Sequence, residues 1–318
     1  MTLVLRTVPV LLLAVLIGVF SSMSPRFLDA QNLTNILVQS SSLAIVAAGM
    51  TFVLLTAGID LSVGSIMFLS AAVAGKMTLG GWPLGAAVCA VLLAGTLFGL
   101  VNAAFIAGLR VLAFIVTLST LYAGRGLGLY ITETRAMNLP EELLAIGAGR
   151  WFGIPAPIWI LALTLAVSHV VLTRTTFGRQ LYAIGNNPEA ARKAGIRVSL
   201  LIASVYAISG FCAALGGLVS VAQLGAVSPT FGNQREFAAI AAAVLGGTSL
   251  FGGRGSVFPG TIIGALLIQT VESGLVIVNA DPYLYPLVLA AIIFAAVLLD
   301  GVSQRQMEKL GRRKIRPA

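Results

Sequence analysis

An acidic residue, Asp60, lies between two strongly apolar stretches of the chain, within residues 58–65 (Gly-Ile-Asp-Leu-Ser-Val-Gly-Ser). A charged side chain is costly inside a membrane, so an acid at such a position has a functional or a structural role. Gly58 can end the preceding helix, and Asp60 or Ser62 can cap the next one. Two interpretations stay open: a broken helix whose polar backbone lines a solute path, or a tight turn in which Asp60 is an N-cap.

A second glycine-rich segment has the same plan. Residues 246–257 read Gly-Gly-Thr-Ser-Leu-Phe-Gly-Gly-Arg-Gly-Ser-Val and separate a short run of small apolar residues from a longer apolar run. Two short helices broken by polar glycine turns predict a parallel internal repeat, over about 42–131 and 198–300, of the kind found in transporters. Chance similarity of composition is the alternative.

The composition indicates the environment of these segments. Hydrophobic residues make up 58% of the 318 residues and charged residues 10%, against about 45–50% and about 25% in ordinary soluble domains. So much apolar surface excludes a soluble enzyme, a secreted disulfide scaffold and a disordered regulator. Cys89 and Cys212 lie inside apolar runs, without the spacing of a metal or redox motif. The formal charge of +9 is typical of basic cytoplasmic loops in a membrane protein rather than of nucleic-acid binding.

Membrane-spanning helices must therefore position the two breaks, because lipid requires each backbone polar group to be satisfied within its own segment. The chain is predicted to be an all-α, polytopic membrane protein, a single transmembrane domain over residues 1–318 with about ten spans. The apolar runs lie at about 8–23, 42–57, 61–77, 83–107, 111–131, 157–173, 198–223, 236–250, 256–278 and 283–300. The runs at 42–57 and 61–77 are short, so they are either one broken span or two, and we take two.

Basic residues orient these spans, because cytoplasmic loops collect Lys and Arg. The 174–197 loop and the chain after residue 304 are the two most basic segments. The loop carries Arg174, Arg179, Arg192, Lys193 and Arg197 against the single acid Glu189, and the tail carries Arg305, Lys309, Arg312, Arg313, Lys314 and Arg316. The predicted spans between the two segments are even in number, which places both on the cytoplasmic side. Counting backward gives a cytoplasmic N-terminus, consistent with Arg6.

The 174–197 loop also contains the signals of a short capped helix. Pro188 and Glu189 suit its first turn, Asn187 suits its N-cap, and Gly195 suits its end. A short helix in a loop needs a surface on which to pack. That surface is either the membrane or a groove on a soluble partner.

Signals for nucleotide hydrolysis and for metal binding are absent from the sequence. No Gly-x-x-x-x-Gly-Lys-Ser/Thr pattern occurs, and the one Gly-Lys pair, Gly75-Lys76, is followed by Met77. His169 is the single histidine and the acids are scattered, so no metal site is predicted. About ten spans leave only about eleven residues for each connection. Any energy source must therefore lie on another polypeptide.

Three motifs together carry a resemblance. They are residues 58–65, residues 178–191 with the core Gly-Asn-Asn-Pro-Glu-Ala-Ala, and residues 236–249 with Glu-Phe-Ala-Ala-Ile-Ala and Leu-Gly-Gly-Thr-Ser. Over about 32–300, the chain resembles the permease subunit of bacterial ABC importers for monosaccharides, the ribose, xylose and galactose permease family. The resemblance implies a second permease subunit, identical or different, two cytoplasmic ABC ATPase subunits or one fused tandem ATPase, and a periplasmic substrate-binding protein. It implies no cofactor, no enzymatic activity and no nucleic acid.

The resemblance also implies roles for individual residues. Residues 188–195 would form the coupling helix that docks on the ATPase, and Asp60 would lie in the family's signature break. The implied coupling residues are Gly178, Arg179, Asn187, Pro188, Glu189, Ala190, Arg192 and Gly195. The chain departs from the family at Ala238, where an acid is frequent, and at Ala194, where a serine is frequent. The departure at Ala238 argues against assigning a polar role to that helix face.

A sugar path is expected to combine hydrogen-bonding side chains with apolar and aromatic surface. The candidates for this path are Thr51, Thr56, Asp60, Ser62, Ser65, Phe68, Asn102, Phe114, Thr117 and Glu272. Inter-helix hydrogen bonds are the alternative use of the polar candidates, and plain packing is the alternative for the two phenylalanines. For Glu272 the alternative is pairing with Arg125.

The sequence thus predicts the permease of an ATP-driven importer of the bacterial inner membrane, which moves a monosaccharide or a sugar-like solute by alternating access. One alternative is an ion-coupled secondary transporter, since Asp60 and Glu272 are acids in apolar surroundings. Another is an ABC permease for a polyol, a nucleoside or a sugar-like signal molecule. No residue is expected to be catalytic.

Overall fold

The computed structural model describes residues 2–314, with side chains described for residues 8–298. The basic side chains of Arg6 and of the tail after residue 304 lie outside the described side chains, and Arg316 lies outside the described residues. The helices are α1 (Thr2–Met23), η1 (Pro25–Leu28), α2 (Ala30–Leu55), α3 (Val63–Leu79), α4 (Leu84–Ala103), η2 (Ala104–Gly108), α5 (Ala113–Thr132), α6 (Glu141–Ala148), α7 (Ala156–Arg174), α8 (Thr176–Asn186), α9 (Pro188–Lys193), α10 (Val198–Leu224), α11 (Arg235–Leu245), η3 (Val257–Thr261), α12 (Ile262–Ile277) and α13 (Leu284–Lys314).

Six of the described helices are long and apolar enough to cross a membrane. They are Ala30–Leu55, Leu84–Gly108, Ala113–Thr132, Ala156–Arg174, Val198–Leu224 and Val257–Ile277. Shorter apolar helices lie at Val8–Met23, Val63–Leu79 and Leu284–Leu298. The predicted all-α, polytopic membrane protein is therefore confirmed. The expected number of about ten spans stays a prediction.

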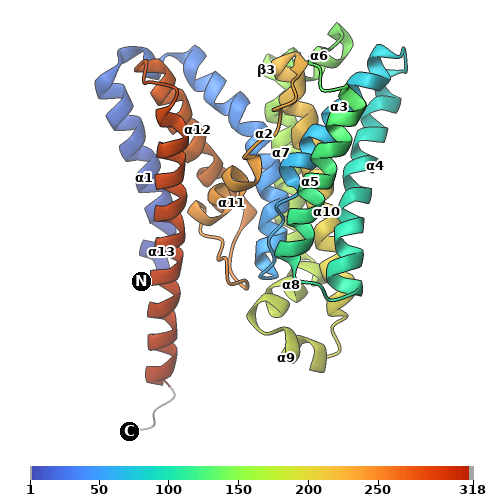
Figure 1. The fold of residues 1–318 in the computed structure, drawn as a ribbon. Coiled ribbons are helices and arrows are strands. Elements are labelled where there is room, and N and C mark those ends of the chain that lie inside the picture. The colour runs from blue at the N-terminus through green and yellow to red at the C-terminus, as the bar shows by residue number, and fades with distance from the viewer. Residues whose placement is uncertain (1, 315–318) are drawn as a thin grey trace.

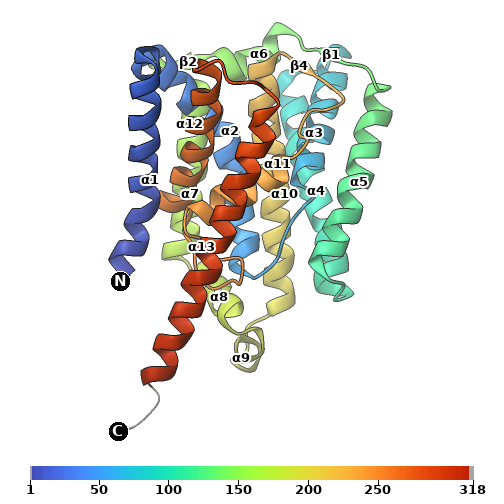
Figure 2. The same cartoon turned by 60° about the vertical axis from the view of Figure 1, so that its left-hand side comes forward.

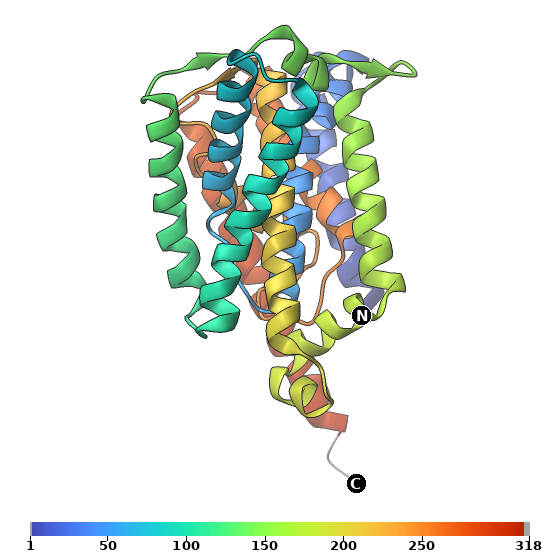
Figure 3. The same cartoon turned by 90° about the vertical axis from the view of Figure 1, so that its right-hand side faces the viewer.

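The long helices run side by side in two parts, a larger part around α10 and a smaller part formed by α1, α12 and α13 (Figures 1 and 3). The α10 helix packs against α2, α3 and α4, while α12 lies between α1 and α2. The short helix α11 packs against α2, α12 and α13 and joins the two parts of the bundle. The core of the larger part is apolar and includes Phe52, Phe68 and Tyr206, all nearly or fully buried.

The two ends of the bundle carry different connections (Figure 2). At one end lie α6 and two small antiparallel strand pairs, β1 (Met137–Asn138) with β4 (Ala226–Val227) and β2 (Arg150–Trp151) with β3 (Ile154–Pro155). At the other end lie α8 and α9, together with the beginning of α1 and the last turns of α13 (Figure 1). The most basic predicted loop and both ends of the described chain thus share one side of the bundle.

Two of the expected apolar runs differ from the helices that contain them in ways that concern the site. The run expected at 42–57 is part of α2, which begins at Ala30 and has 26 residues, about 39 Å of helix. Polar residues in its first turns lower the local hydropathy and concealed its beginning. The run expected at 236–250 is the 11-residue helix α11, about 16 Å long, which is too short to span a membrane by itself.

The structure contains both predicted breaks. Residues 56–62 separate α2 from α3, and residues 246–256 separate α11 from η3. In Figure 2 the irregular chain after α2 rises from the lower end of the bundle to the beginning of α3. Left-handed backbone at Ala57 (φ 58°), Gly247 (φ 91°) and Gly252 (φ 84°) turns the chain at these breaks. The backbone N–H of Gly253 donates to the Leu55 carbonyl at 3.0 Å, so the two breaks contact each other.

Candidate functional site

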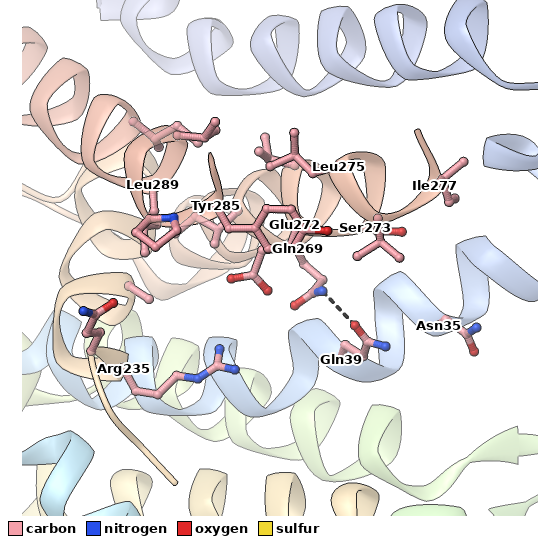
Figure 4. Close-up of a pocket in the computed structure, with 18 of the residues that line it drawn as sticks. Asn35, Gln39, Arg235, Gln269, Glu272, Ser273, Leu275, Ile277, Tyr285 and Leu289 are labelled. Carbon is pink, nitrogen blue, oxygen red and sulfur yellow. Dashed lines mark hydrogen bonds between the residues drawn. The ribbon is translucent and has the colours of Figure 1, made fainter. Parts of the chain in front are cut away.

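A cavity of about 460 Å³ lies between α2, α11, α12 and α13 (Figure 4). Its volume is within the range of about 300–1,000 Å³ that is typical of small-molecule sites. One wall is polar and the other is apolar. The lining residues are Asn32, Asn35 and Gln39 of α2; Asn233, Gln234, Arg235 and Ala238 at the beginning of α11; Ile268, Gln269, Val271, Glu272, Ser273, Leu275, Val276 and Ile277 of α12; and Tyr285, Pro286, Val288, Leu289 and Ile292 of α13.

Helical spacing places the polar lining residues on facing surfaces. Asn32, Asn35 and Gln39 follow one another at intervals of three and four residues, so they share one face of α2. On α12, Gln269 and Glu272 are three residues apart and share the face that is turned toward α2. Two helix faces that carry polar residues thus meet across the cavity.

Two side-chain hydrogen bonds join α2 and α12 across the cavity wall. The Nε2 of Gln269 donates to the Oε1 of Gln39 at 2.8 Å, and the Oγ of Ser273 donates to the Oδ1 of Asn32 at 2.9 Å (Figure 4 draws the first). Asn32 in turn donates from its Nδ2 to the Phe27 carbonyl at 2.7 Å. These bonds hold the amides of Asn32, Gln39 and Gln269 in place, since each of the three takes part in at least one of them.

Arg235 and Glu272 bring the two charges of the cavity lining. Arg235 is the first residue of α11 and Glu272 lies in the middle of α12, and both side chains border the same space in Figure 4. A guanidinium donates hydrogen bonds and a carboxylate accepts them, while the neighbouring amides do both. Together these groups can hold a solute that carries several hydroxyl groups.

Asp60 is fully buried and accepts three hydrogen bonds. Its Oδ1 accepts from the backbone N–H of Ser62 at 3.0 Å and from the Ser62 hydroxyl at 2.6 Å, and its Oδ2 accepts from the Ser209 hydroxyl at 2.7 Å. The first bond closes an Asx-type turn directly before α3. The last bond ties this turn to α10.

Further polar side chains extend this network to α4 and α5. The Nδ2 of Asn102 donates to the Ser62 hydroxyl at 2.8 Å, and the Thr120 hydroxyl donates to the Oδ1 of Asn102 at 2.7 Å. The Thr117 hydroxyl contacts the Ile59 carbonyl at 3.3 Å. The structure therefore brings Asp60, Ser62, Asn102 and Thr117 together. Their hydrogen bonds connect α3, α4, α5 and α10 at the first break.

The other path candidates lie on or next to several different helices. The Thr51 hydroxyl shares a 2.7 Å hydrogen bond with Thr261 of η3, while the hydroxyls of Thr56 and Ser65 bond to carbonyls of their own turns. Phe68 is buried, and Phe114 is 48% exposed. Of the ten candidates, Glu272 lines the described cavity and the other nine are not among its lining residues.

Arg125 lies away from Glu272, in contact with other groups. Its guanidinium stacks 5.0 Å from the ring centre of Phe68 and donates to the Phe231 carbonyl. It also interacts electrostatically with Glu236, the second residue of α11. Glu272 therefore lines the cavity rather than contacting Arg125, and its role in a solute path stays a prediction.

The predicted capped helix is present as α9. The Oδ1 of Asn187 accepts from the backbone N–H groups of Glu189 at 3.1 Å and Ala190 at 3.0 Å, as an N-cap does. Pro188 is its first residue, and Gly195 has a left-handed φ of 83° after its end. Ala191 packs inward, whereas Pro188, Glu189, Ala190 and Arg192 are exposed.

The preceding helix α8 contacts both breaks. The Tyr182 hydroxyl donates to the Gly255 carbonyl at 2.9 Å. Gly185 lies so close to the Leu55 carbonyl and the Gly253 backbone N–H that a β-carbon would overlap both. Gly178 is buried against the Leu172 carbonyl, where a β-carbon would also overlap, while Arg179 is exposed. The loop is thus a rigid connection between an exposed helix and the two breaks.

Sequence reasoning missed most of the cavity lining. Asn32, Asn35 and Gln39 precede the run that was expected to begin at about residue 42, and Arg235 and Gln269 were not singled out. The signal that was available is the spacing of polar residues by three and four in two segments separated by more than 200 residues. Among the described residues, no group of three His, Cys, Asp or Glu side chains is arranged to hold a metal.

Comparisons with known proteins identify the family of the chain. The family model described as the permease component of branched-chain amino acid transport systems matches residues 32–297. The chain is 41% identical over 294 residues to the ribose import permease protein RbsC of Haemophilus influenzae, covering 91% of both chains. It is 39% identical to the D-allose transport system permease protein AlsC of Escherichia coli, covering 91% of this chain and 89% of the relative.

A further relative is named for a different solute. The chain is 34% identical to the autoinducer 2 import system permease protein LsrC of Photorhabdus luminescens, covering 95% of this chain and 91% of the relative. No solved structure matches the chain.

Proposed function

Because the chain belongs to the family of permease components of ABC-type importers, we propose that it moves a monosaccharide or a sugar-like solute across the bacterial inner membrane as one subunit of an ATP-driven importer. The relatives named for ribose and D-allose support a monosaccharide. The relative named for autoinducer 2 keeps a sugar-like signal molecule within the same class.

The exposed, capped helix α9 is the observation that carries the coupling part of the proposal. A six-residue helix has no stability of its own, and α9 is fixed by Asn187 and Ala191 while its remaining surface is free to contact a partner. Glu189, Arg192 and Lys193 offer charges of both signs on this surface. A soluble ATPase subunit that receives this helix supplies the energy that the permease lacks.

The proposed assembly follows from the separation of the permease from the subunit that hydrolyses ATP. It contains two cytoplasmic ATPase subunits or one fused tandem ATPase, a second permease subunit and a periplasmic substrate-binding protein. Both termini and the α8–α9 segment lie on the cytoplasmic side, and the chain crosses the membrane about ten times. ATP binding draws the two α9 helices together, and hydrolysis resets them, so that access alternates between the two sides.

Replacing Glu189 and Arg192 by alanine tests the docking surface. We expect the amount of ATPase subunit that co-purifies with the permease to fall by about tenfold, because charged pairs at an interface contribute strongly to binding. The matched control is the double variant Arg135→Ala and Glu142→Ala, which removes the same charges from exposed positions at the opposite end of the bundle. Unchanged co-purification and uptake in the first variant would contradict the coupling role.

The source of energy is tested separately by measuring uptake in proteoliposomes. We expect D-ribose uptake to require the ATPase subunit and ATP, and to persist when proton and sodium gradients are dissipated. Uptake that continues without the ATPase and collapses with the ion gradient would identify a secondary transporter instead.

A further inference from the structure

We propose that the cavity between α2, α11, α12 and α13 is a binding site for an uncharged, polyhydroxylated solute of monosaccharide size, and that Arg235 and Glu272 are its charged contacts. The proposal rests on the proposed function for its place in transport. The site itself rests on the geometry of the cavity and does not depend on the energy source of transport.

The polar wall is fixed before any solute arrives. The Gln269–Gln39 and Ser273–Asn32 hydrogen bonds tie α2 to α12 at two positions, and Gln269 is only 3% exposed. A binding wall that is already ordered loses little conformational entropy when it takes a ligand. The same bonds orient the amide oxygens and nitrogens that border the cavity.

The charge of the lining favours a neutral solute. Arg235 and Glu272 are the charged members of the lining and their formal charges cancel, while the remaining polar lining residues are amides, Ser273 and Tyr285. A net anion would be repelled by Glu272, and a net cation would be repelled by Arg235. Each hydroxyl of a sugar both donates and accepts a hydrogen bond, and therefore matches a wall that alternates amide, guanidinium and carboxylate groups.

The apolar wall complements the carbon-bound side of a sugar ring. Val271 of α12 and Val288 and Leu289 of α13 border the cavity, and Tyr285 and Pro286 lie at the beginning of α13. Ligand sites combine apolar surface with a few polar groups that set orientation. At position 238, where an acid is frequent in the family, this chain contributes only the methyl group of Ala238. Glu272 is therefore the one acid among the described lining residues.

Thiol labelling tests the site without requiring transport. The variant Val276→Cys places a thiol at a lining position that is 60% exposed, in a Cys89→Ser background that removes the exposed native thiol; Cys212 is buried. The full-length permease in nanodiscs is labelled with a small water-soluble methanethiosulfonate, in the presence of D-ribose, D-allose, D-xylose, D-galactose or L-leucine. We expect at least one of the sugars to slow labelling severalfold, and L-leucine to have no effect.

Two sets of controls make the result specific. Labelling of Thr134→Cys, an exposed position outside the cavity, should not respond to any sugar. In the Val276→Cys protein, Arg235→Gln or Glu272→Gln should raise the sugar concentration needed for half-maximal protection by about tenfold or more, measured relative to the labelling rate of the same variant without sugar, since hydrogen bonds to charged groups are the stronger ones.

The outcomes separate this inference from the proposed function. If none of the four sugars protects Val276→Cys, or if L-leucine does, the cavity proposal is wrong even when ATP-driven D-ribose uptake is present. If a sugar protects the thiol but uptake does not depend on the ATPase, the cavity proposal holds and the proposed function fails.

Discussion

The hydroxyl of Tyr182 donates a 2.9 Å hydrogen bond to the backbone carbonyl of Gly255. This bond joins α8, which continues directly into the exposed helix α9, to the glycine-rich break after α11. Two residues earlier in the same break, the Gly253 N–H donates to the Leu55 carbonyl at the end of α2. A displacement of α9 therefore has a continuous path of contacts to α2 and to α11, two of the helices that line the cavity.

We predict that Tyr182→Phe weakens coupling without preventing assembly. The substitution removes one hydrogen bond, worth about 0.5–1.5 kcal/mol, and keeps the ring. We expect solute uptake per assembled complex to fall by about two- to tenfold, while ATPase co-purification stays unchanged. Burial raises the pKa of Tyr182, so its hydroxyl stays protonated near neutral pH and the effect should not vary between pH 6 and about pH 9.

Tyr122→Phe is the matched control for this change, because Tyr122 is 70% exposed on α5. Uptake that falls equally in both variants, or that is unaffected by Tyr182→Phe, would show that the bond carries no coupling.

A larger effect is expected from Gly185→Ala. A β-carbon at this position would overlap the Leu55 carbonyl and the Gly253 backbone N–H, and neither group is a side-chain end that can move aside. Overpacking of this kind costs about 1–3 kcal/mol. We expect a lower thermal midpoint in detergent and the loss of most uptake. Gly126→Ala in α5, where a β-carbon meets open space, should be neutral or slightly stabilising. An intact Gly185→Ala protein with full uptake would contradict the close contact between α8 and the breaks.

Local signals predicted α9 and the two breaks, because their structure is set by nearby residues. An Asn before Pro-Glu, and a glycine at a left-handed position, specify a cap and a helix end within a few residues of chain. The same reasoning placed Asp60 and Ser62 at the beginning of α3. The hydrogen bonds of Asp60 to Ser209 and of Asn102 to Ser62 join residues far apart in the sequence, so no local pattern specifies them.

The cavity was missed for a different physical reason. Hydropathy identifies helices that face lipid or core, and Asn32, Asn35 and Gln39 lower it in the first turns of α2 because they face a polar space. The helix was therefore predicted to begin at about residue 42 rather than at Ala30. The polar side chains that line the cavity are thus the reason why hydropathy did not locate the beginning of α2.

The buried network around Asp60 should contribute mainly to stability. Ser209→Ala removes one donor to a buried carboxyl group and should lower the free energy of unfolding by about 1–3 kcal/mol, and Asp60→Ala should lower it further, because three donors lose their acceptor. Ser70→Ala on α3 is the matched control. Its hydroxyl is buried without a hydrogen-bond partner among the described residues, so its removal should not destabilise the protein. Thermal unfolding in detergent measures all three; normal stability with reduced uptake in Asp60→Ala would assign Asp60 to the solute path instead.

The N-cap of α9 should decide how well the permease holds its ATPase. Asn187→Ala removes the acceptor of two backbone N–H groups, which costs about 0.5–2 kcal/mol of helix stability, and a six-residue helix has little else to offset the loss. We expect ATPase co-purification to fall by about two- to tenfold while the thermal midpoint of the bundle stays the same, because α9 contributes only Ala191 to the apolar core. Asn187→Asp keeps the acceptor oxygen at the cap and should restore co-purification. If Asn187→Asp is as defective as Asn187→Ala, the asparagine amide contacts the partner directly, and its role as a cap is not what binding requires.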